Sequence, residues 1–267
     1  MSGAKSTRRQ ALAGLGAAAA VWCCGDHLSG QPAVAAPAVS TGHRPPAGRA
    51  SRVDVAPGLS IHPRADWGAD LPPKWAMPPE VVKFLLVHHT ATSNDISDPR
   101  SLIRGVYAFH TSSAKRWPDV AYNFFVAPDG SVWEGRAGSI AGPVTADATG
   151  GNQGYSQLVC LLGNYVDVAP TAAAQASLVR TLAWLAGRFS LNTYADASTT
   201  FVSRGSNKFA AGQTITTPIV SAHRDVTFTA CPGDAAVALL PDWRRRVHRT
   251  LATTWRRRGT IPSASRA

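Results

Sequence analysis

The chain has 267 residues, of which 45% are hydrophobic and 16% are charged. This length suffices for a sizeable core, in one large domain or two small ones, and the composition excludes a disordered chain, a collagen and a multi-span membrane protein. The net charge of +11, from 27 Lys and Arg against 16 Asp and Glu, first suggests a polyanionic partner such as nucleic acid.

The basic charge is concentrated at the two ends of the chain. Residues 1–36 carry three cations and one acid, and residues 242–267 carry eight arginines and one acid. Residues 37–241 carry 16 cations and 14 acids, so the body of the protein is nearly neutral. Nucleic-acid binding through the arginine-rich end is therefore a weak hypothesis. It also needs stacking aromatics, and only Trp243 and Trp255 stand among these arginines.

Residues 1–36 have the pattern of an export signal. Arg8 and Arg9 precede an uncharged, weakly hydrophobic stretch, and small residues at 33–35 suit a signal peptidase. The paired arginines favour the twin-arginine route, with cleavage after Ala35 or Ala36. We therefore expect an exported protein, located in the periplasm, the cell wall or the medium.

Two alternatives to a cleaved signal are weaker. A retained membrane anchor would need roughly 20 apolar residues, more than the uncharged stretch provides, so we expect no stable membrane span after signal removal. A lipoprotein modified at Cys23 or Cys24 is disfavoured by the bulky Trp22, since the residue before a lipidated cysteine is normally small.

The body of the chain predicts strands intermixed with helices. Continuous apolar runs indicate core strands, and apolar residues at helical spacing after a capping residue or a proline indicate helices. Residues 190–217 are polar and strand-prone, which predicts an inserted loop or a hairpin. The predicted strands are 81–89, 157–163 and 219–223, a hairpin joins 122–127 to 131–134, and the predicted helices are 97–111, 171–189 and 242–253.

These elements predict one α/β domain with a central mixed β-sheet flanked by helices. We expect this domain to cover residues 59–253. Residues 37–58, rich in Pro, Ala, Gly and Ser, are predicted to form a flexible linker before it, and residues 254–267 a basic C-terminal tail.

Cys160 and Cys231 are the two cysteines of the mature chain. In an exported protein, two cysteines often form one disulfide. Cys160, however, lies in a continuous apolar run that predicts a buried strand, where cysteine is an ordinary small hydrophobic residue. We therefore expect no disulfide between them.

Two histidines and one cysteine form a candidate metal site. His88 lies at the end of one predicted strand, His223 ends another, and Cys231 follows eight residues later before Pro-Gly. Two imidazoles and a thiolate can hold zinc with a fourth position open, as a hydrolase needs. Each residue alone also has a structural explanation, as a polar residue at a strand edge or a cysteine in a turn, and the spacing by itself leaves both interpretations open.

Six motifs in order give a more specific signal. Together they resemble the peptidoglycan recognition protein family, which is similar to the zinc-dependent N-acetylmuramoyl-L-alanine amidases of phage-lysozyme type. The resemblance covers roughly residues 60–250. The motifs stand at residues 64–69, 88–91, 119–124, 133–136, 162–165 and 223–233.

The resemblance implies an active amidase with its zinc site in a groove at strand ends. It implies that His88, His223 and Cys231 bind one Zn²⁺, and that Tyr122 and Thr229 take part in catalysis. Recognition-only members of the family lack a complete ligand set, which this chain keeps. The expected activity is hydrolysis of the bond between N-acetylmuramic acid and L-alanine in peptidoglycan, and a non-catalytic peptidoglycan-binding module is the alternative.

Other polar residues near these motifs have less certain roles. His89 should point away from the metal, because adjacent strand residues face opposite ways. His110, Arg136 and Asn123 are candidate substrate-binding residues, although His110 could cap a helix and Arg136 could form a structural salt bridge. Asp225 could orient His223 or Arg224, or form a surface ion pair.

Two further expectations concern partners. The family's Gly-Trp after Glu-Gly-Arg is replaced here by Ala137-Gly138, so the choice of stem peptide is left open. The arginines of the C-terminal tail are expected to attract anionic wall polymers by salt-sensitive electrostatics.

Overall fold

The computed structural model describes residues 52–255 of the chain. The predicted signal peptide, most of the predicted linker, and residues 256–267 of the basic tail lie outside these residues. Within the described part, no helix combines the length and apolar character needed to cross a membrane.

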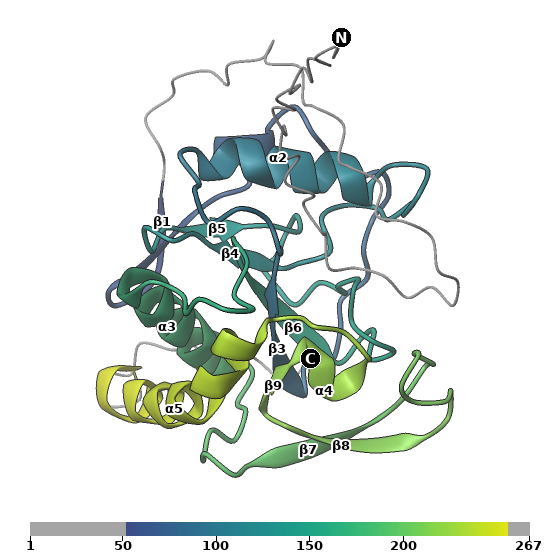
Figure 1. Cartoon of the computed structure of the whole chain (residues 1–267), viewed down its shortest axis with the longest axis vertical. Helices are drawn as coiled ribbons and strands as arrows, with labels where there is room; N and C mark the ends of the chain where they lie inside the picture. Colours follow the sequence, from purple (N-terminus) through teal and green to yellow (C-terminus); the bar gives the residue numbers. More distant parts are fainter. Residues whose placement is uncertain (1–51, 256–267) are drawn as a thin grey trace, which may run out of the picture.

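A seven-stranded mixed sheet forms the centre of the molecule (Figure 1). Strands β3, β6 and β9 run parallel to one another, and β4 and β5 form the predicted antiparallel hairpin. This confirms the predicted α/β fold. In spatial order the strands are β1 (Val53–Ala56), β2 (Leu59–His62), β5 (Val132–Glu134), β4 (Phe124–Val126), β6 (Ser156–Leu161), β3 (Phe84–His89) and β9 (Val220–Ala222).

Helices cover both faces of this sheet. Helix α2 (Pro99–His110) packs against the face that carries Phe84 and Leu86. Helices α3 (Ala172–Arg188) and α5 (Asp234–Thr250) pack together against the other face, which carries Leu85 and Val87. Since successive strand residues face opposite ways, one apolar strand supplies both cores.

The predicted helix starts are explained by their caps. The Asp98 carboxylate accepts a hydrogen bond from the Arg100 N–H, and Pro99 occupies the first turn of α2. The Thr171 hydroxyl accepts from the Ala174 N–H at the start of α3. Each side chain satisfies a backbone donor that the helix itself leaves without a partner.

Helix α5 begins at Asp234 rather than at the predicted residue 242. Proline removes a backbone hydrogen-bond donor and usually interrupts a helix. Instead, Pro241 lies inside the helix, and Ala236 and Leu240 are buried with the later residues of the same helix. This burial outweighs the missing hydrogen bond.

The predicted linker is too long at its C-terminal end. Residues Val53–Ala56 form strand β1, which pairs with β2 around the turn at Pro57-Gly58. The prediction gave too little weight to the alternation of Val53 and Val55, which is short but has the period of a strand.

Residues 190–217 were expected to form either a loop or a hairpin, and the structure has a hairpin whose second strand extends one residue beyond this range. Strands β7 (Ser198–Val202) and β8 (Thr214–Pro218) form a separate two-stranded sheet. It is attached to the domain by Phe201, whose buried ring stacks on Phe84 with centroids 5.4 Å apart. Figure 1 shows this hairpin beside the short helix α4 (His223–Val226).

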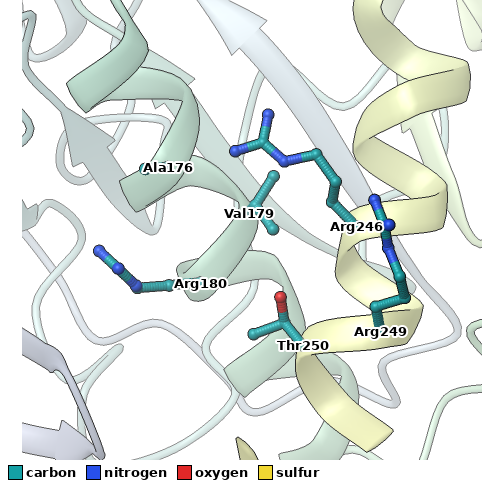
Figure 2. A pocket seen from close by; sticks show the side chains of 6 residues that line it. All are labelled: Ala176, Val179, Arg180, Arg246, Arg249 and Thr250. Carbon is teal, nitrogen blue, oxygen red and sulfur yellow. The ribbon is translucent and has the colours of Figure 1, made fainter. Parts of the chain in front are cut away.

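A hollow of about 270 Å³ lies between α3 and α5 (Figure 2). Figure 2 shows Arg246 extending from α5 toward Val179 of α3, whereas Arg180 extends away from it. The hollow belongs to the helix layer that covers the Leu85 and Val87 face of the sheet. Its lining residues are Ala176, Val179, Arg180, Arg246, Arg249 and Thr250.

Candidate metal centre

Sheet register brings the three candidate ligands together. Val87 of β3 pairs with Ala222 of the parallel strand β9, and His88 and His223 are the next residues of each chain segment. Because parallel strands end at the same edge of a sheet, the two imidazoles meet, with ring centroids 4.2 Å apart. Cys231 comes from the loop between α4 and α5, and its Sγ lies 3.6 Å from His88 Nδ1.

The donor atoms of these residues fit a metal ion. One ligand atom from each of His88, His223 and Cys231 lies within 4.8 Å of the others, and all three residues are buried. Within residues 52–255, His88 Nε2 and His223 Nδ1 are buried without a hydrogen-bond partner. Buried polar atoms normally have partners, and a nitrogen–nitrogen–sulfur set is one that suits zinc.

Both imidazoles are held in the neutral form that binds metals. Burial, together with the neighbouring His223, lowers the pKa of His88 well below its usual range. Burial, with a smaller effect of His89, lowers the pKa of His223 to about 3. Neutral imidazole carries the lone pair that a metal needs, so no proton has to be removed from either ring near neutral pH.

His89 lies on the opposite face of β3, as predicted. Its Nδ1 accepts a hydrogen bond from the Tyr165 N–H at 3.2 Å, on the side of α3 and α5. Its backbone N–H donates to Cys231 Sγ at 3.3 Å. His89 therefore contributes its backbone to the sulfur and its side chain to the support of a neighbouring loop.

The loop that carries Cys231 is fixed by close backbone packing. Gly233 has φ +96°, and a Cβ at this position would lie 2.2 Å from the Tyr165 carbonyl carbon and oxygen. Thr229 Oγ1 accepts a hydrogen bond from the Cys231 N–H at 3.2 Å. Cys231 is not in a disulfide, and neither is Cys160 of β6, which confirms the sequence prediction.

Tyr122 lies next to the candidate ligands. Its ring is buried, with its centroid 5.1 Å from that of His88. The rings of His110 and Phe125 contact it edge-on. Gly135 allows the neighbouring chain to approach this residue closely, since a Cβ on it would lie 2.3 Å from the Tyr122 carbonyl oxygen.

The three side chains predicted to bind substrate are buried, and each has polar partners within the protein. Arg136 is 1% exposed and forms a partly buried ion pair with Asp147, as the structural alternative expects. Asn123 Nδ2 donates to the Val144 carbonyl, and its Oδ1 accepts from the Leu158 N–H.

The His110 side chain likewise bonds within the protein. It is 1% exposed, and its Nδ1 accepts a hydrogen bond from the Ala121 N–H at 3.0 Å. Burial lowers its pKa well below the usual range, so the ring is neutral. Its contact with the Tyr122 ring makes it a support for that residue.

Asp225 does not orient His223. Its carboxylate accepts a hydrogen bond from the Ala222 N–H at 2.9 Å and so caps α4. Two residues of the β7–β8 connection, Asn207 and Lys208, instead contact the chain between His223 and Cys231. The sequence offers no signal for these contacts, because they join polar residues of a loop to backbone atoms about 20 positions away.

Comparison with known families shows what the chain resembles. A family model described as N-acetylmuramoyl-L-alanine amidase matches residues 78–234. The human N-acetylmuramoyl-L-alanine amidase is 32% identical over 192 residues, which cover 69% of this chain and 28% of that protein. The chain thus spans less than a third of the length of this relative.

Solved structures share the fold. The Drosophila peptidoglycan recognition protein SD is 22% identical, with a TM-score of 0.53 over 68% of this chain and 94% of that chain. Peptidoglycan recognition protein LE, solved with tracheal cytotoxin, a monomeric diaminopimelic acid-type peptidoglycan, is 25% identical. Its TM-score is 0.50 over 68% of this chain and 93% of that chain.

Proposed function

Because the chain belongs to the N-acetylmuramoyl-L-alanine amidase family, we propose that it hydrolyses the amide bond between N-acetylmuramic acid and L-alanine in peptidoglycan. We assign one Zn²⁺ to His88, His223 and Cys231. The observation that carries this proposal is that three buried residues bring their ligand atoms within 4.8 Å of one another. Each of the two imidazoles also has one buried nitrogen without a hydrogen-bond partner among the described residues.

Zinc bound by three protein ligands would supply Lewis-acid activation of water and of the amide carbonyl. His88 and His223 present neutral nitrogens to it because burial keeps them deprotonated. The His89 N–H donates to Cys231 Sγ and stabilises negative charge on the sulfur. The chain thereby prepares the ligands for the ion.

Tyr122 and Thr229 are assigned to the charge that develops on the amide oxygen. A hydroxyl that donates to this oxygen lowers the barrier, since the negative charge is largest in the transition state. The Tyr122 ring lies against His88. Thr229 Oγ1 already accepts a hydrogen bond from the Cys231 N–H, which leaves its own hydroxyl proton available for donation.

We infer the substrate class from a ligand bound to a related protein. Peptidoglycan recognition protein LE, which is 25% identical, was solved with a monomeric diaminopimelic acid-type peptidoglycan. A muropeptide is therefore the substrate that we assign to this chain. Ala137-Gly138 stands where many family members have Gly-Trp, so we assign no stem-peptide preference.

The alternative is a module that binds peptidoglycan without cleaving it, as the names of several relatives suggest. Metal content and product formation separate the two functions. The purified full chain should contain about one zinc per molecule, and mass spectrometry should detect free stem peptide released from defined muropeptides. Chelation should abolish release, and added zinc should restore it.

Substitution of ligands tests the assigned residues. Cys231→Ser and His223→Ala should each lose zinc and cleavage activity, while the matched variants Cys160→Ala and His248→Ala should retain both. Full activity in either ligand variant would overturn the metal site. A zinc-loaded protein that binds muropeptides and releases no peptide would support the binding module instead.

A further inference from the structure

The chain between the two ligands His223 and Cys231 is held by its own contacts, among them the Arg224 side chain on the Ala230 carbonyl, and by contacts from another segment. We call residues 224–230 the ligand loop. Its backbone makes a few hydrogen bonds of its own, from Thr227 N–H to the His223 carbonyl and from Arg224 N–H to the Cys231 carbonyl. A short segment loses conformational entropy when it is ordered, so contacts from outside help to fix its position.

Asn207 supplies such contacts from the β7–β8 hairpin. Its Oδ1 accepts hydrogen bonds from the Thr227 hydroxyl and from the Phe228 N–H, the latter at 2.8 Å. Its Nδ2 donates to the Phe228 carbonyl at 3.0 Å. One amide side chain therefore binds both backbone groups of Phe228, as a neighbouring strand would.

Lys208 and Ser206 hold the preceding part of the ligand loop. Lys208 Nζ donates to the Arg224 carbonyl at 2.8 Å and to the Asp225 carbonyl at 3.0 Å. The Ser206 hydroxyl donates to the Val226 carbonyl at 3.2 Å. A lysine ammonium has three donors, and charge-assisted bonds of this type are stronger than neutral ones.

The connection that carries Ser206, Asn207 and Lys208 is itself held by backbone hydrogen bonds. Within the connection between β7 and β8, the Ser203 and Gly212 backbone groups continue the pairing of the two strands. The Arg204 N–H donates to the Gly151 carbonyl at 2.7 Å, which ties the connection to the main domain. A Cβ on Gly150 would lie 2.9 Å from the Thr227 side chain, so the ligand loop also packs closely against this glycine.

We propose that residues 206–208 form a clamp that sets the position of the ligand loop, and thereby the distance between His223 and Cys231. Asn207 and Lys208 are positioning residues, because their side chains bond to the ligand loop rather than to His88, His223 or Cys231. This inference rests on the proposed metal site. Partners outside the ligand shell commonly change metal affinity 10- to 100-fold, because they determine how well the ligands are arranged before the metal arrives.

Zinc affinity tests the clamp directly. Asn207→Ala and Lys208→Met in the full chain should weaken zinc binding about tenfold or more, measured by competition with a chromogenic chelator. Asn207→Asp keeps the acceptor oxygen and loses the donor, so its affinity should fall between those of the wild type and Asn207→Ala. Circular dichroism and thermal unfolding would verify that each variant is folded.

Matched controls come from the same region. Lys83 donates to the Thr200 carbonyl at the other end of the hairpin, and Asn192 accepts from the Tyr194 N–H in an exposed turn. Lys83→Met and Asn192→Ala make the same chemical changes away from the ligand loop. Both should keep the zinc affinity of the wild type within about twofold.

A second measurement uses the zinc-free protein, so that its result does not depend on the proposed function. Hydrogen–deuterium exchange of peptides covering residues 224–231 should be faster in Asn207→Ala and Lys208→Met than in the wild type, and unchanged in the two controls. Unchanged exchange in both clamp variants would overturn the clamp, as would zinc affinities equal to the wild type. If the wild type bound no zinc, the metal centre would fail, and the exchange data alone would still decide the clamp.

Discussion

His88 and His89 are adjacent in the sequence and have opposite surroundings. The side chain of His88 faces His223 and Tyr122, while that of His89 accepts the Tyr165 N–H on the other side of the sheet. The strand period of two separates them. At the scale of the residue, the alternation of the strand places the His88 side chain in the candidate metal centre and the His89 side chain against the neighbouring loop at Tyr165.

Tyr122 gives a prediction about the rate of the reaction. Tyr122→Phe removes the hydroxyl and keeps the ring against His88, so the variant should retain zinc. If the hydroxyl donates to the developing oxyanion, kcat for muropeptide cleavage should fall about 100- to 1000-fold. Metal analysis and steady-state kinetics would check this. A variant with the wild-type kcat would exclude the assigned role.

Glu80 gives a prediction about pH and stability. Burial, opposed by the hydrogen bond from Gln157, raises the pKa of its carboxyl from 4.5 to about 8. Glu80 Oε1 accepts from Gln157 Nε2 at 2.6 Å, while Glu80 Oε2 and Gln157 Oε1 are buried without partners among the described residues. A protonated carboxyl supplies a donor that the ionised form lacks.

The sign of the pH effect follows from proton linkage. Between pH 4.5 and about 8 the folded protein keeps a proton on Glu80 that the unfolded chain releases, so the free energy of unfolding falls as pH rises through this window. Glu80→Gln removes this contribution. Its Tm relative to the wild type should therefore increase from pH 5 to pH 9, and identical pH profiles of the two proteins would contradict the prediction.

At the scale of the element, short connections matter more than the regular helices and strands. Helix α4 has only four residues, yet it begins with His223, and its other three residues are the first of the ligand loop. Helix α5 begins directly after Cys231-Pro232-Gly233. The two helices and strand β9 thus fix both ends of the segment that carries two of the three candidate ligands.

Gly233 gives a prediction for this segment. Gly233→Ala adds a Cβ to a residue with φ +96° and places it 2.2 Å from the Tyr165 backbone. Backbone strain alone costs about 1–3 kcal/mol, and the clash adds to it, so unfolding in urea should show a larger loss. Gly212→Ala is the matched control, because Gly212 has φ +83° with no atom within 4 Å of the added Cβ. Equal losses in both variants would mean that the close approach is unimportant.

At the scale of the whole molecule, the charge is separated from the candidate chemistry. Helix α5 carries Arg246 and Arg249 at the hollow of Figure 2, on the helix layer opposite to the face of His88. The predicted signal and the rest of the basic tail lie outside the described residues. We propose that the chain is exported and that the tail holds it near anionic wall polymers.

The tail proposal predicts salt-sensitive binding. Deletion of residues 254–267, or replacement of Arg256, Arg257 and Arg258 by glutamine, should weaken binding to intact cell walls several-fold at low ionic strength. The difference should disappear near 1 M salt, where the Debye length is about 3 Å. Pull-down with purified walls measures both. Cleavage of soluble muropeptides should be unchanged, and unaltered wall binding at low salt would reject the tether.

The family resemblance of the sequence pointed to the three candidate ligands, which spacing alone had left open. The sequence alone determined the fold class and most strand and helix positions. These features depend on local patterns, such as the apolar run of β3 and the capping residue Asp98, which neighbouring residues largely decide. It could not tell that Arg136 and Asn123 are buried, that α5 continues through Pro241, or that Asn207 reaches the ligand loop.

Only the tertiary structure decided these points, because each depends on which distant segments meet. The register of β3 against β9 brings His88 and His223 together across more than 130 residues of chain. The same packing surrounds Arg136 with acceptors and presses the β7–β8 hairpin against the segment before Cys231. Local sequence pattern therefore predicts which strands and helices form, and the order and register of the strands decide which distant residues lie in the same site.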